Sequence, residues 1–425
     1  AEGASMSVIG LVMSRRLGPL TVAQACGALN DNLVKNAMVV LALFRLQAGA
    51  TGLSALAGTL FIAPYILLSA TAGVLADRFA KHWLIRVYKI AELLLMLGAA
   101  AAFLAASVPA LLAVLFGLGV QAALFGPVKY GVLPEYLADA ELLGGNAVVE
   151  ATTFLAIVCG TVAGGGLILL EHGAAIVGLG GVALSTVGLA AAWRMPPLQA
   201  AVPRLALDAN VVRETWRVVG AAQRSRVAWL SILGLSWFWT MGATVLTELP
   251  VIVRDTLRAE GAVLTLLLGV FAVGVGVGSL GCTRLLRGRV SPRLAPAAGV
   301  GISVFCAGFA WAAAAGGVAT VGDAAGSVAG WRLITALGLL AACGGVFSVP
   351  LYAIIQEAAE PGARARMVAA NNVMNALFMV FGAAAAAGMA AAGLSAPQAL
   401  LVAAAANGAV AVWLGMVLGR RRLAG

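Results

Sequence analysis

Charged side chains are scarce in this sequence. Only 10% of its 425 residues are Asp, Glu, Lys or Arg, whereas 62% are hydrophobic. Soluble globular chains are about 25% charged, and a soluble domain cannot bury so large an apolar fraction. The shortage of charge therefore excludes a soluble globular protein and predicts an all-α, polytopic membrane protein.

Histidine and cysteine are also rare. His82 and His172 both fall in predicted loops, and the five cysteines are scattered without a CxxC pair. We therefore expect no metal site, no cofactor, no catalytic residues and no enzyme activity. A phosphate-binding loop is missing as well, so the sequence does not encode ATP-driven pumping.

Hydrophobic runs long enough to span a bilayer, which takes about 20 residues, are what the sequence has in abundance. We count twelve, six on each side of a polar stretch. They lie at residues 19–46, 53–76, 83–106, 109–135, 143–170, 174–194, 227–250, 261–285, 293–316, 327–355, 365–392 and 397–419. The predicted domains are an N-terminal segment (1–18), a six-helix bundle (19–194), a basic linker (195–226), a second six-helix bundle (227–419) and a basic tail (420–425). Residues 1–5 precede Met6 and are expected to be an expression remnant.

Basic residues are distributed unevenly over the predicted loops. With both termini in the cytoplasm, 20 of the 27 Lys and Arg residues fall on the cytoplasmic side. Those on the outer side are Arg45, Arg254, Arg258 and Arg332. Because basic residues collect in cytoplasmic loops, this asymmetry predicts a multi-pass protein with both termini cytoplasmic. It also explains the net charge of +10 without nucleic acid as a partner.

Two stretches of the chain echo each other, as expected of a transporter built from repeats with its site between them. The matching pairs are Phe125 with Phe347, Tyr130 with Tyr352, Glu135 with Glu357, Asn146 with Asn371, and Glu150 with Asn375.

Residues 73–82, GVLADRFAKH, resemble the loop signature of the major facilitator superfamily, G-x-L-A-D-R-x-G-R/K-R. Ala80 and His82 depart from that signature. The resemblance implies twelve helices in two pseudo-symmetric bundles and a loop that latches them. We expect Asp77 to act in this latch by facing a helix N-terminus, where an anion is favoured. The alternative is a charged turn that only sets topology. The candidate gating residues are Gly73, Asp77, Arg78, Lys81, Glu135, Gln356 and Glu357.

A closer resemblance rests on LNDNLVKNA (29–37), FGPVKYGVLPE with GGNAVVEA (125–135, 144–151) and VPLYAIIQE (349–357). Together these runs resemble the bacterial lysophospholipid transporter family. The resemblance implies a monomer in the bacterial cytoplasmic (inner) membrane. It would flip lysophosphatidylethanolamine and related lipids inward, for re-acylation by a partner acyltransferase/acyl carrier protein synthetase.

Ionisable residues inside predicted spans point to the headgroup site, since each costs about 2.5–3.5 kcal/mol in a membrane. Asp31 and Lys35 share a face of the first span, flanked by Asn30, Asn32 and Asn36. We expect Asp31 to meet the lipid ammonium, and Lys35 to neutralise Asp31 or meet phosphate. The alternative is a self-satisfied ion pair that only helps packing.

Lys129 and Glu150 flank the turn between spans four and five. Three roles stay open for them. The two residues could pair as a gate that closes the cytoplasmic end, Lys129 could bind the lipid phosphate, or the two could form a static buried ion pair. Asn371 and Asn375 would add neutral hydrogen bonding from the second half. Lys89 and Glu92 are expected to form a local pair.

Two other functions stay open: a facilitator that exports another amphipathic solute or drug, and a non-transporting membrane anchor for an acyltransferase. Buried charge argues against an anchor. A lipid substrate also predicts an opening towards the bilayer between spans 5 and 8 or 2 and 11, where Gly160, Gly164, Gly274 and Gly278 would allow movable contacts.

Overall fold

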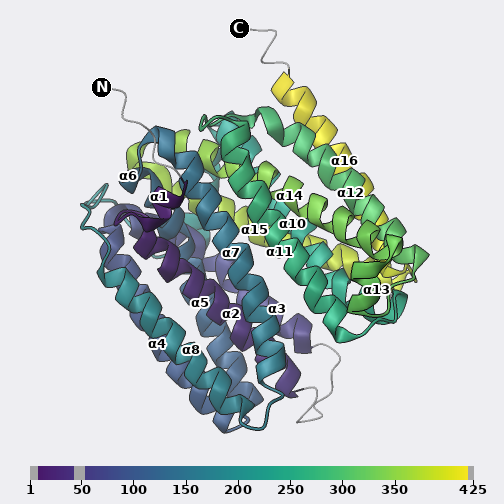
Figure 1. Cartoon of the computed structure of the whole chain (residues 1–425). Helices are drawn as coiled ribbons and strands as arrows, with labels where there is room; N and C mark the ends of the chain where they lie inside the picture. The colour runs from purple at the N-terminus through teal and green to yellow at the C-terminus, as the bar shows by residue number, and fades with distance from the viewer. Residues whose placement is uncertain (1–7, 43–52, 420–425) are drawn as a thin grey trace. The chain divides into compact units, whose positions relative to one another are not determined.

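The structure is a computed structural model that describes residues 8–42 and 53–419, and within these ranges every regular element is a helix (Figure 1). The predicted all-α class is therefore confirmed. The long helices of the first half are α2 (Gly18–Val40), α3 (Leu53–Arg78), α4 (Lys81–Leu104), α5 (Val108–Gly131), α7 (Asp139–Leu167) and α8 (Gly173–Trp193). Those of the second half are α10 (Arg226–Val251), α11 (Gly261–Leu285), α12 (Ala295–Ala315), α14 (Val328–Glu357), α15 (Arg364–Ala391) and α16 (Ala396–Gly419).

Eleven helices in the described ranges are long and apolar enough to cross a membrane by length and composition. The twelfth long helix, α2, is not among them, since Asn30, Asp31, Asn32 and Lys35 interrupt its apolar sequence. With α2, the long helices match the twelve predicted spans. The least apolar of the long helices is thus the one that carries the densest group of candidate site residues.

Several short elements join the long helices. They are α1 (Val8–Met13), α6 (Leu133–Tyr136), α9 (Val211–Gln223), α13 (Val321–Gly326), a π-helical turn at Ile252–Thr256 and 3-10 turns at Pro292–Leu294 and Pro361–Ala363. The predicted linker, 195–226, thus contains a helix. Asn210 starts it, because its Oδ1 accepts hydrogen bonds from the backbone N–H groups of Val212 and Arg213, both at 3.1 Å. Residues 1–7, Arg45 and the tail at 420–425 lie outside the described residues.

The chain forms two compact units. The first comprises Ala1–Trp229 together with Ile355–Ala376, and the second comprises Leu230–Ile354 and Leu377–Gly425. The end of α14 and the start of α15 therefore belong to the same unit as the first six long helices. The predicted domain boundaries remain predictions.

The four glycines that we assigned to movable seams pack against helices of their own units, so the role predicted for these glycines was wrong, whereas the opening towards the bilayer stays a prediction. Gly160 and Gly164 of α7 face the backbone of α2, where an added Cβ would lie 3.1 Å from the nitrogens of Leu33 and Ala37. Gly274 and Gly278 face α14 in the same way within the second unit. Small residues identify a face for close helix packing, but their spacing does not reveal which helix the face contacts.

A proline interrupts the backbone hydrogen bonding of α14. Pro350 has no N–H to donate to the carbonyl of Val346, four residues earlier. The Sγ of Cys282 in α11 donates to that carbonyl instead, at 3.8 Å. A weak thiol hydrogen bond thus replaces the missing backbone bond.

Candidate functional site

The polar face of α2 carries Asp31 and Lys35 one helical turn apart, and both side chains are half-buried. Their opposite charges attract each other. Lys35 nevertheless directs its Nζ to Asn32, donating to Oδ1 at 3.2 Å, and lies 6.0 Å from the centre of the Phe61 ring. Among the described residues, Lys35 therefore forms no direct ion pair with Asp31, and its ammonium group can interact with a ligand.

Asp31 lies among charges from three helices. It interacts electrostatically with Glu92 and Lys89 of α4, Lys35 of α2 and Lys129 of α5. Its Oδ1 is buried and accepts no hydrogen bond from the part of the chain that the structure describes. Because buried carboxylate oxygens normally have donors, this atom is an open acceptor suited to a cationic group or a water molecule.

Lys129 and Glu150 extend this group of charges onto α5 and α7. Lys129 is half-buried, is attracted by Glu150 and Asp31, and holds its Nζ 5.0 Å from the centre of the Tyr130 ring. Glu150 is fully buried and accepts a hydrogen bond from the Tyr130 hydroxyl at 3.3 Å. The residues that the sequence singled out on spans one, four and five thus come together in one electrostatic cluster.

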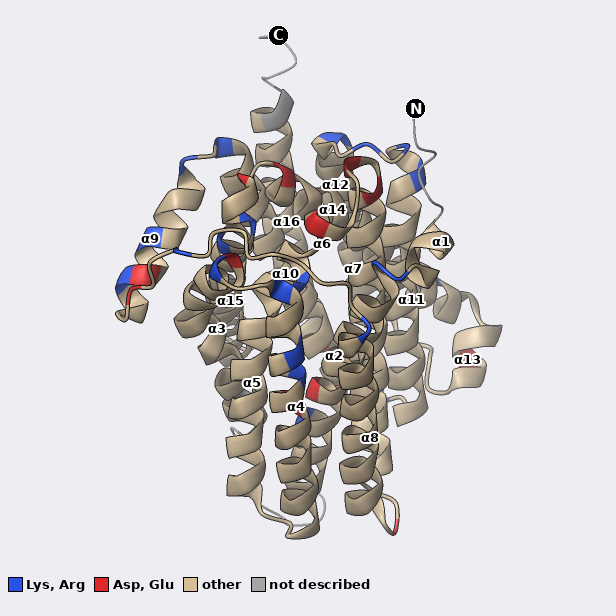
Figure 2. Ribbon diagram, turned by 90° about the vertical axis from the view of Figure 1, so that its left-hand side faces the viewer, with Lys and Arg blue, Asp and Glu red and all other residues tan. Residues whose placement is uncertain are grey.

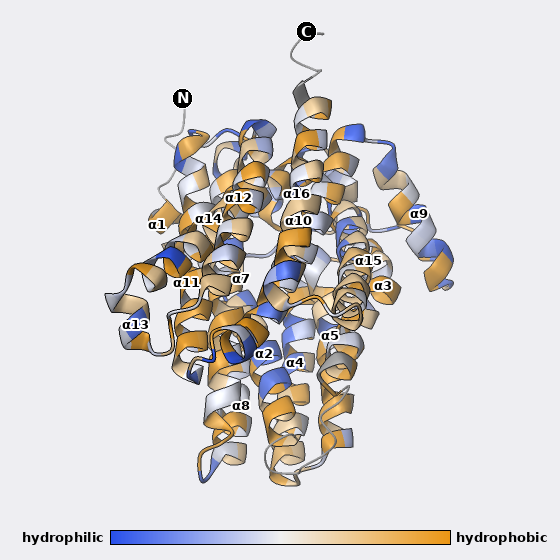
Figure 3. Cartoon of the chain, turned by 90° about the vertical axis from the view of Figure 1, so that its right-hand side faces the viewer, coloured by the Kyte–Doolittle hydropathy of each residue, from blue (hydrophilic) through white to orange (hydrophobic). Residues whose placement is uncertain are grey.

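Lys89 and Glu92 form a fully buried ion pair in α4, with Nζ and Oε2 2.5 Å apart. The predicted local pair is confirmed, but it is not isolated. Asn30 and Gln121 each donate to the Glu92 carboxylate at 3.3 Å. Figures 2 and 3 show the result as charged and hydrophilic segments part of the way along helices α2 and α4, which are otherwise hydrophobic.

Asp77 faces the N-terminus of α15, and the expectation that this carboxylate faces a helix N-terminus is confirmed. Its Oδ1 accepts from the backbone N–H of Ala365 at 3.2 Å, and its Oδ2 accepts from that of Arg366 at 3.3 Å. The Arg366 Nε also donates to Oδ2, at 3.0 Å. The carboxylate is fully buried, so these N–H groups replace its hydration, and the positive end of the helix favours its charge.

Gly73 allows α3 to approach α15 this closely. A Cβ at this position would lie 2.6 Å from the Cβ of Ala369 and 2.9 Å from the Cα of Arg366. Any larger residue would therefore push the two helices apart.

Lys81 and Glu135 form a second contact beside Asp77. The Lys81 Nζ is 2.5 Å from Glu135 Oε1 and 3.9 Å from Asp77 Oδ1, and Lys81 is fully buried. Arg364, the first residue of α15, donates to the carbonyl of Pro134 at 3.2 Å. Lys81 thus connects the turn after α5 to Asp77, and Arg364 connects that turn to the start of α15.

Gln356 links the end of α14 to α5 and α7. Its Nε2 donates to the Tyr130 carbonyl at 3.0 Å, and its amide exchanges hydrogen bonds with Asn146 at 2.6 and 3.1 Å. Gln356 is fully buried and Asn146 nearly so. We refer to these contacts and those of Asp77, Lys81 and Arg366 as the latch.

The remaining predicted site residues lie as follows. Arg78 lies over the Phe79 ring, 5.5 Å from its centre, and Glu357 is exposed. Asn371 and Asn375 are buried in the part of α15 that belongs to the first unit. Both polar atoms of the Asn371 amide make no hydrogen bond with the described residues.

Two functional candidates were missed from the sequence. Gln121 is a single amide in an apolar span, which is a recognisable but weak signal. Arg366 was counted only as a topology-setting charge, although it provides the side-chain partner of Asp77. Within residues 8–42 and 53–419, no three His, Cys, Asp or Glu side chains are grouped so that they could hold a metal ion.

Comparison with known proteins assigns the family. A model of the Major Facilitator Superfamily matches residues 20–329. The chain is 30% identical to the lysophospholipid transporter LplT of Escherichia coli O157:H7 over 350 residues, 81% of each protein. It is 30% identical to LplT of Serratia proteamaculans over 358 residues, also 81% of each.

Solved structures share the fold at lower identity. A bacterial homologue of the iron transporter ferroportin, in an outward-facing state, matches with a TM-score of 0.67 at 15% identity, over 94% of this chain and 100% of that one. The human organic anion transporter MFSD10 matches with a TM-score of 0.68 at 14% identity, over 95% and 99%. The chain therefore belongs to the major facilitator superfamily and, within it, to the family of the lysophospholipid transporters.

Proposed function

We propose that this protein moves lysophospholipids, such as lysophosphatidylethanolamine, across the bacterial cytoplasmic membrane by alternating access. The observation that carries the proposal is the half-buried charge cluster of Asp31, Lys35 and Lys129 in the membrane-spanning part of the first unit. Charges at such positions are costly unless they line a site or a wet cavity. In a member of this family, a polar lipid headgroup is the ligand that best matches them.

The two poles of a zwitterionic headgroup fit the two signs of charge in this cluster. The open Oδ1 of Asp31 suits the ammonium group. Lys129 suits the phosphate, as a compact cationic donor, and Lys35 is placed to assist it. Glu150, which is fully buried and attracts Lys129, would hold the Lys129 ammonium group in position.

The latch would close the cytoplasmic end of the pathway. It joins α3, α5 and α7 to the end of α14 and the start of α15 through buried polar contacts. A lipid can leave on that side only after these contacts break. Gly73, Asp77, Lys81, Glu135 and Gln356 are therefore the gating residues that we propose.

The membrane orientation and the partner follow from the same reasoning. The excess of basic residues in predicted cytoplasmic loops supports cytoplasmic termini. A lysophospholipid lacks one acyl chain, so its return to the phospholipid pool requires an acyltransferase. We propose that this chain delivers the lipid as a monomer and that the separate acyltransferase/acyl carrier protein synthetase performs the chemistry.

Uptake of labelled lysophosphatidylethanolamine into proteoliposomes tests the proposal. The wild type should transport it, whereas Asp31→Asn and Lys129→Ala should each reduce the rate at least about tenfold, as expected for the loss of one charged hydrogen bond. Asp255→Asn, an exposed carboxylate in the second unit, is the matched control and should transport normally.

The same assay separates the alternatives. An exporter of another solute would show no saturable lysolipid uptake but would respond to that solute, and an anchor would transport nothing. Normal uptake by both Asp31→Asn and Lys129→Ala would refute the proposed headgroup site.

A further inference from the structure

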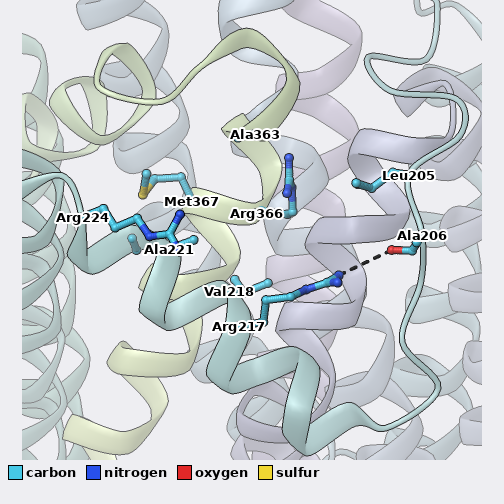
Figure 4. Close-up of a pocket in the computed structure, with 10 residues that line it drawn as sticks. Leu205, Ala206, Arg217, Val218, Ala221, Arg224, Ala363, Arg366 and Met367 are labelled. Atoms are coloured by element: carbon cyan, nitrogen blue, oxygen red, sulfur yellow. Dashed lines mark hydrogen bonds between the residues drawn. The ribbon is translucent and has the colours of Figure 1, made fainter.

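A cavity of about 380 Å³ lies between α9, the segment before it and the start of α15, all within the first unit (Figure 4). Small-molecule sites usually occupy about 300–1,000 Å³. The preceding segment is fixed in place, because Val202 donates its backbone N–H to the Asp77 carbonyl at 2.8 Å and Leu198 donates to His82 at 3.1 Å. The cavity is therefore a built feature of the first unit.

Three arginines line this cavity, together with apolar side chains that include Leu205, Val218 and Met367. Arg217 pairs with Glu214 at 2.7 Å, and Arg366 pairs with Asp77. Arg224 makes no side-chain hydrogen bond or ion pair with any residue that the structure describes. The three guanidinium groups thus have only two carboxylate partners, Glu214 and Asp77. This excess of positive charge beside apolar walls suits an anion with an apolar portion.

Arg366 can reach an occupant without leaving Asp77. Its Nε donates to Asp77, and its Nη2 donates to the Gly362 carbonyl at 2.7 Å. Among the described residues, its Nη1 has no hydrogen-bond partner. A planar guanidinium can therefore donate to a second anion from that side.

The outer face of α9 resembles a helix at a membrane surface. Val212 and Trp216 are 57% and 74% exposed and lie one turn apart. Arg213 and Arg217 are exposed beside them, whereas Glu214, Val218 and Ala222 are buried. Amphipathic helices with basic residues and an exposed Trp lie at the level of the lipid headgroups. The cavity under α9 is then within reach of phospholipids in the leaflet on the linker side.

We propose that this cavity binds the phosphate group of an anionic phospholipid from that leaflet. Arg217 and Arg224 hold the phosphate by charge-assisted hydrogen bonds, the apolar wall takes the lipid backbone, and Arg366 joins through Nη1. Bound lipid fixes Arg366 against Asp77 and so strengthens the latch. The site is separate from the charge cluster at Asp31, and its occupation does not depend on transport.

Native mass spectrometry of the full chain, with added phosphatidylglycerol or phosphatidylcholine of the same acyl composition, tests the proposal. The wild type should retain phosphatidylglycerol in preference to phosphatidylcholine. Arg224→Gln should weaken phosphatidylglycerol binding roughly tenfold. Ala221→Glu, which places a negative charge on the cavity wall and leaves all three arginines intact, should do the same.

Two controls on the same helix separate a site from diffuse attraction. Arg213→Gln removes an exposed arginine that pairs with Asp208 and does not line the cavity. Gln223→Glu adds a negative charge to α9 at a position that also does not line the cavity. Both should bind phosphatidylglycerol like the wild type. Equal weakening by Arg224→Gln and Arg213→Gln would overturn the proposal. So would equal retention of the two lipids by the wild type, or displacement of phosphatidylglycerol by millimolar inorganic phosphate.

Discussion

Asp77 and Arg366 lie 289 positions apart in the sequence, yet the Asp77 carboxylate receives both the backbone N–H and the side-chain Nε of Arg366. One buried carboxylate thus serves as the N-terminal cap of α15 and as the ion-pair partner of a residue in its first turn.

Asp77→Asn should loosen the start of α15. The amide keeps part of the hydrogen bonding but loses the charge, which costs about 2–3 kcal/mol from the charged hydrogen bonds and the helix dipole together. Hydrogen exchange of residues 355–376 should therefore accelerate about tenfold or more. Arg78→Gln, which alters the neighbouring residue outside the latch, should leave this exchange unchanged. Unchanged exchange in Asp77→Asn would show that the contact does not hold the segment.

Gly73→Val should open the same contact by steric means. Overpacked sites typically cost about 1–3 kcal/mol, and the new side chain would collide with Ala369 and Arg366. Exchange over residues 355–376 should again increase. Gly58→Val is the matched control, because an added Cβ at Gly58 of the same helix meets no atom within 4 Å; if both variants behave alike, close packing at Gly73 is not the cause.

Gln356→Leu should lower thermal stability. It removes the Gln356 donor from the Tyr130 carbonyl and from the buried Asn146 Oδ1, at a cost of about 1–3 kcal/mol, while Asn146 Nδ2 keeps its hydrogen bond to the Leu142 carbonyl. Adding Asn146→Leu removes the second orphaned group, so the double variant should be more stable than the sum of the two single effects. Additive losses in unfolding temperature would contradict the proposed coupling. Gln223→Leu, an exposed glutamine on α9, should be neutral.

The Lys89–Glu92 pair allows a structural role to be separated from a role in transport. Lys89→Met alone leaves the Glu92 carboxylate buried without its cation and should destabilise the protein by about 3–5 kcal/mol. The double variant Lys89→Met/Glu92→Leu should recover much of that stability. If the double variant also transports lysolipid normally, the pair is structural; if it folds but does not transport, the pair belongs to the headgroup site.

Asp323, which caps the short helix α13, gives a prediction about pH. Hydrogen bonds from the backbone N–H groups of Thr320 and Ala319 hold its pKa below the ordinary value. A lowered folded-state pKa stabilises the capped form above the unfolded pKa of about 4, and this stabilisation disappears as the pH falls through the folded pKa. Hydrogen exchange within Val321–Gly326, corrected for its intrinsic pH dependence, should therefore be steady above about pH 4 and accelerate below it. Asp323→Asn should abolish that step.

The membrane-spanning architecture could be predicted from the sequence because each long helix must carry its own apolar run. The contact between Asp77 and a helix N-terminus was also predictable, because an acidic residue in a loop is favoured at the positive end of a helix. Asp31, Lys129 and Glu150 could be singled out because ionisable residues are rare in apolar spans. These predictions depend on the local chemistry of one segment.

The contacts between helices could not be predicted in this way, because they depend on which distant segments pack against each other. Arg366 and Gln356 take their roles from partners on other helices, and no local pattern identifies those partners. The helix that Gly160 and Gly164 contact was undetermined for the same reason. The α9 helix did have a local signal, since Asn210 precedes a run with Val211, Val218 and Ala222 on one face, but the prolines and basic charge of the linker concealed it.

At the Val346 carbonyl, the Cys282 thiol takes the place of the backbone donor that Pro350 lacks, and this affects how easily α14 bends. Four residues beyond that proline, α14 leaves the second unit and enters the first. The Val346 carbonyl has no backbone donor at position 350 and accepts only the weak thiol hydrogen bond from Cys282 in its place. Prolines are common sites of helix bending, so this turn of α14 is the one with the least backbone resistance to bending, close to the point where the helix passes from one unit to the other.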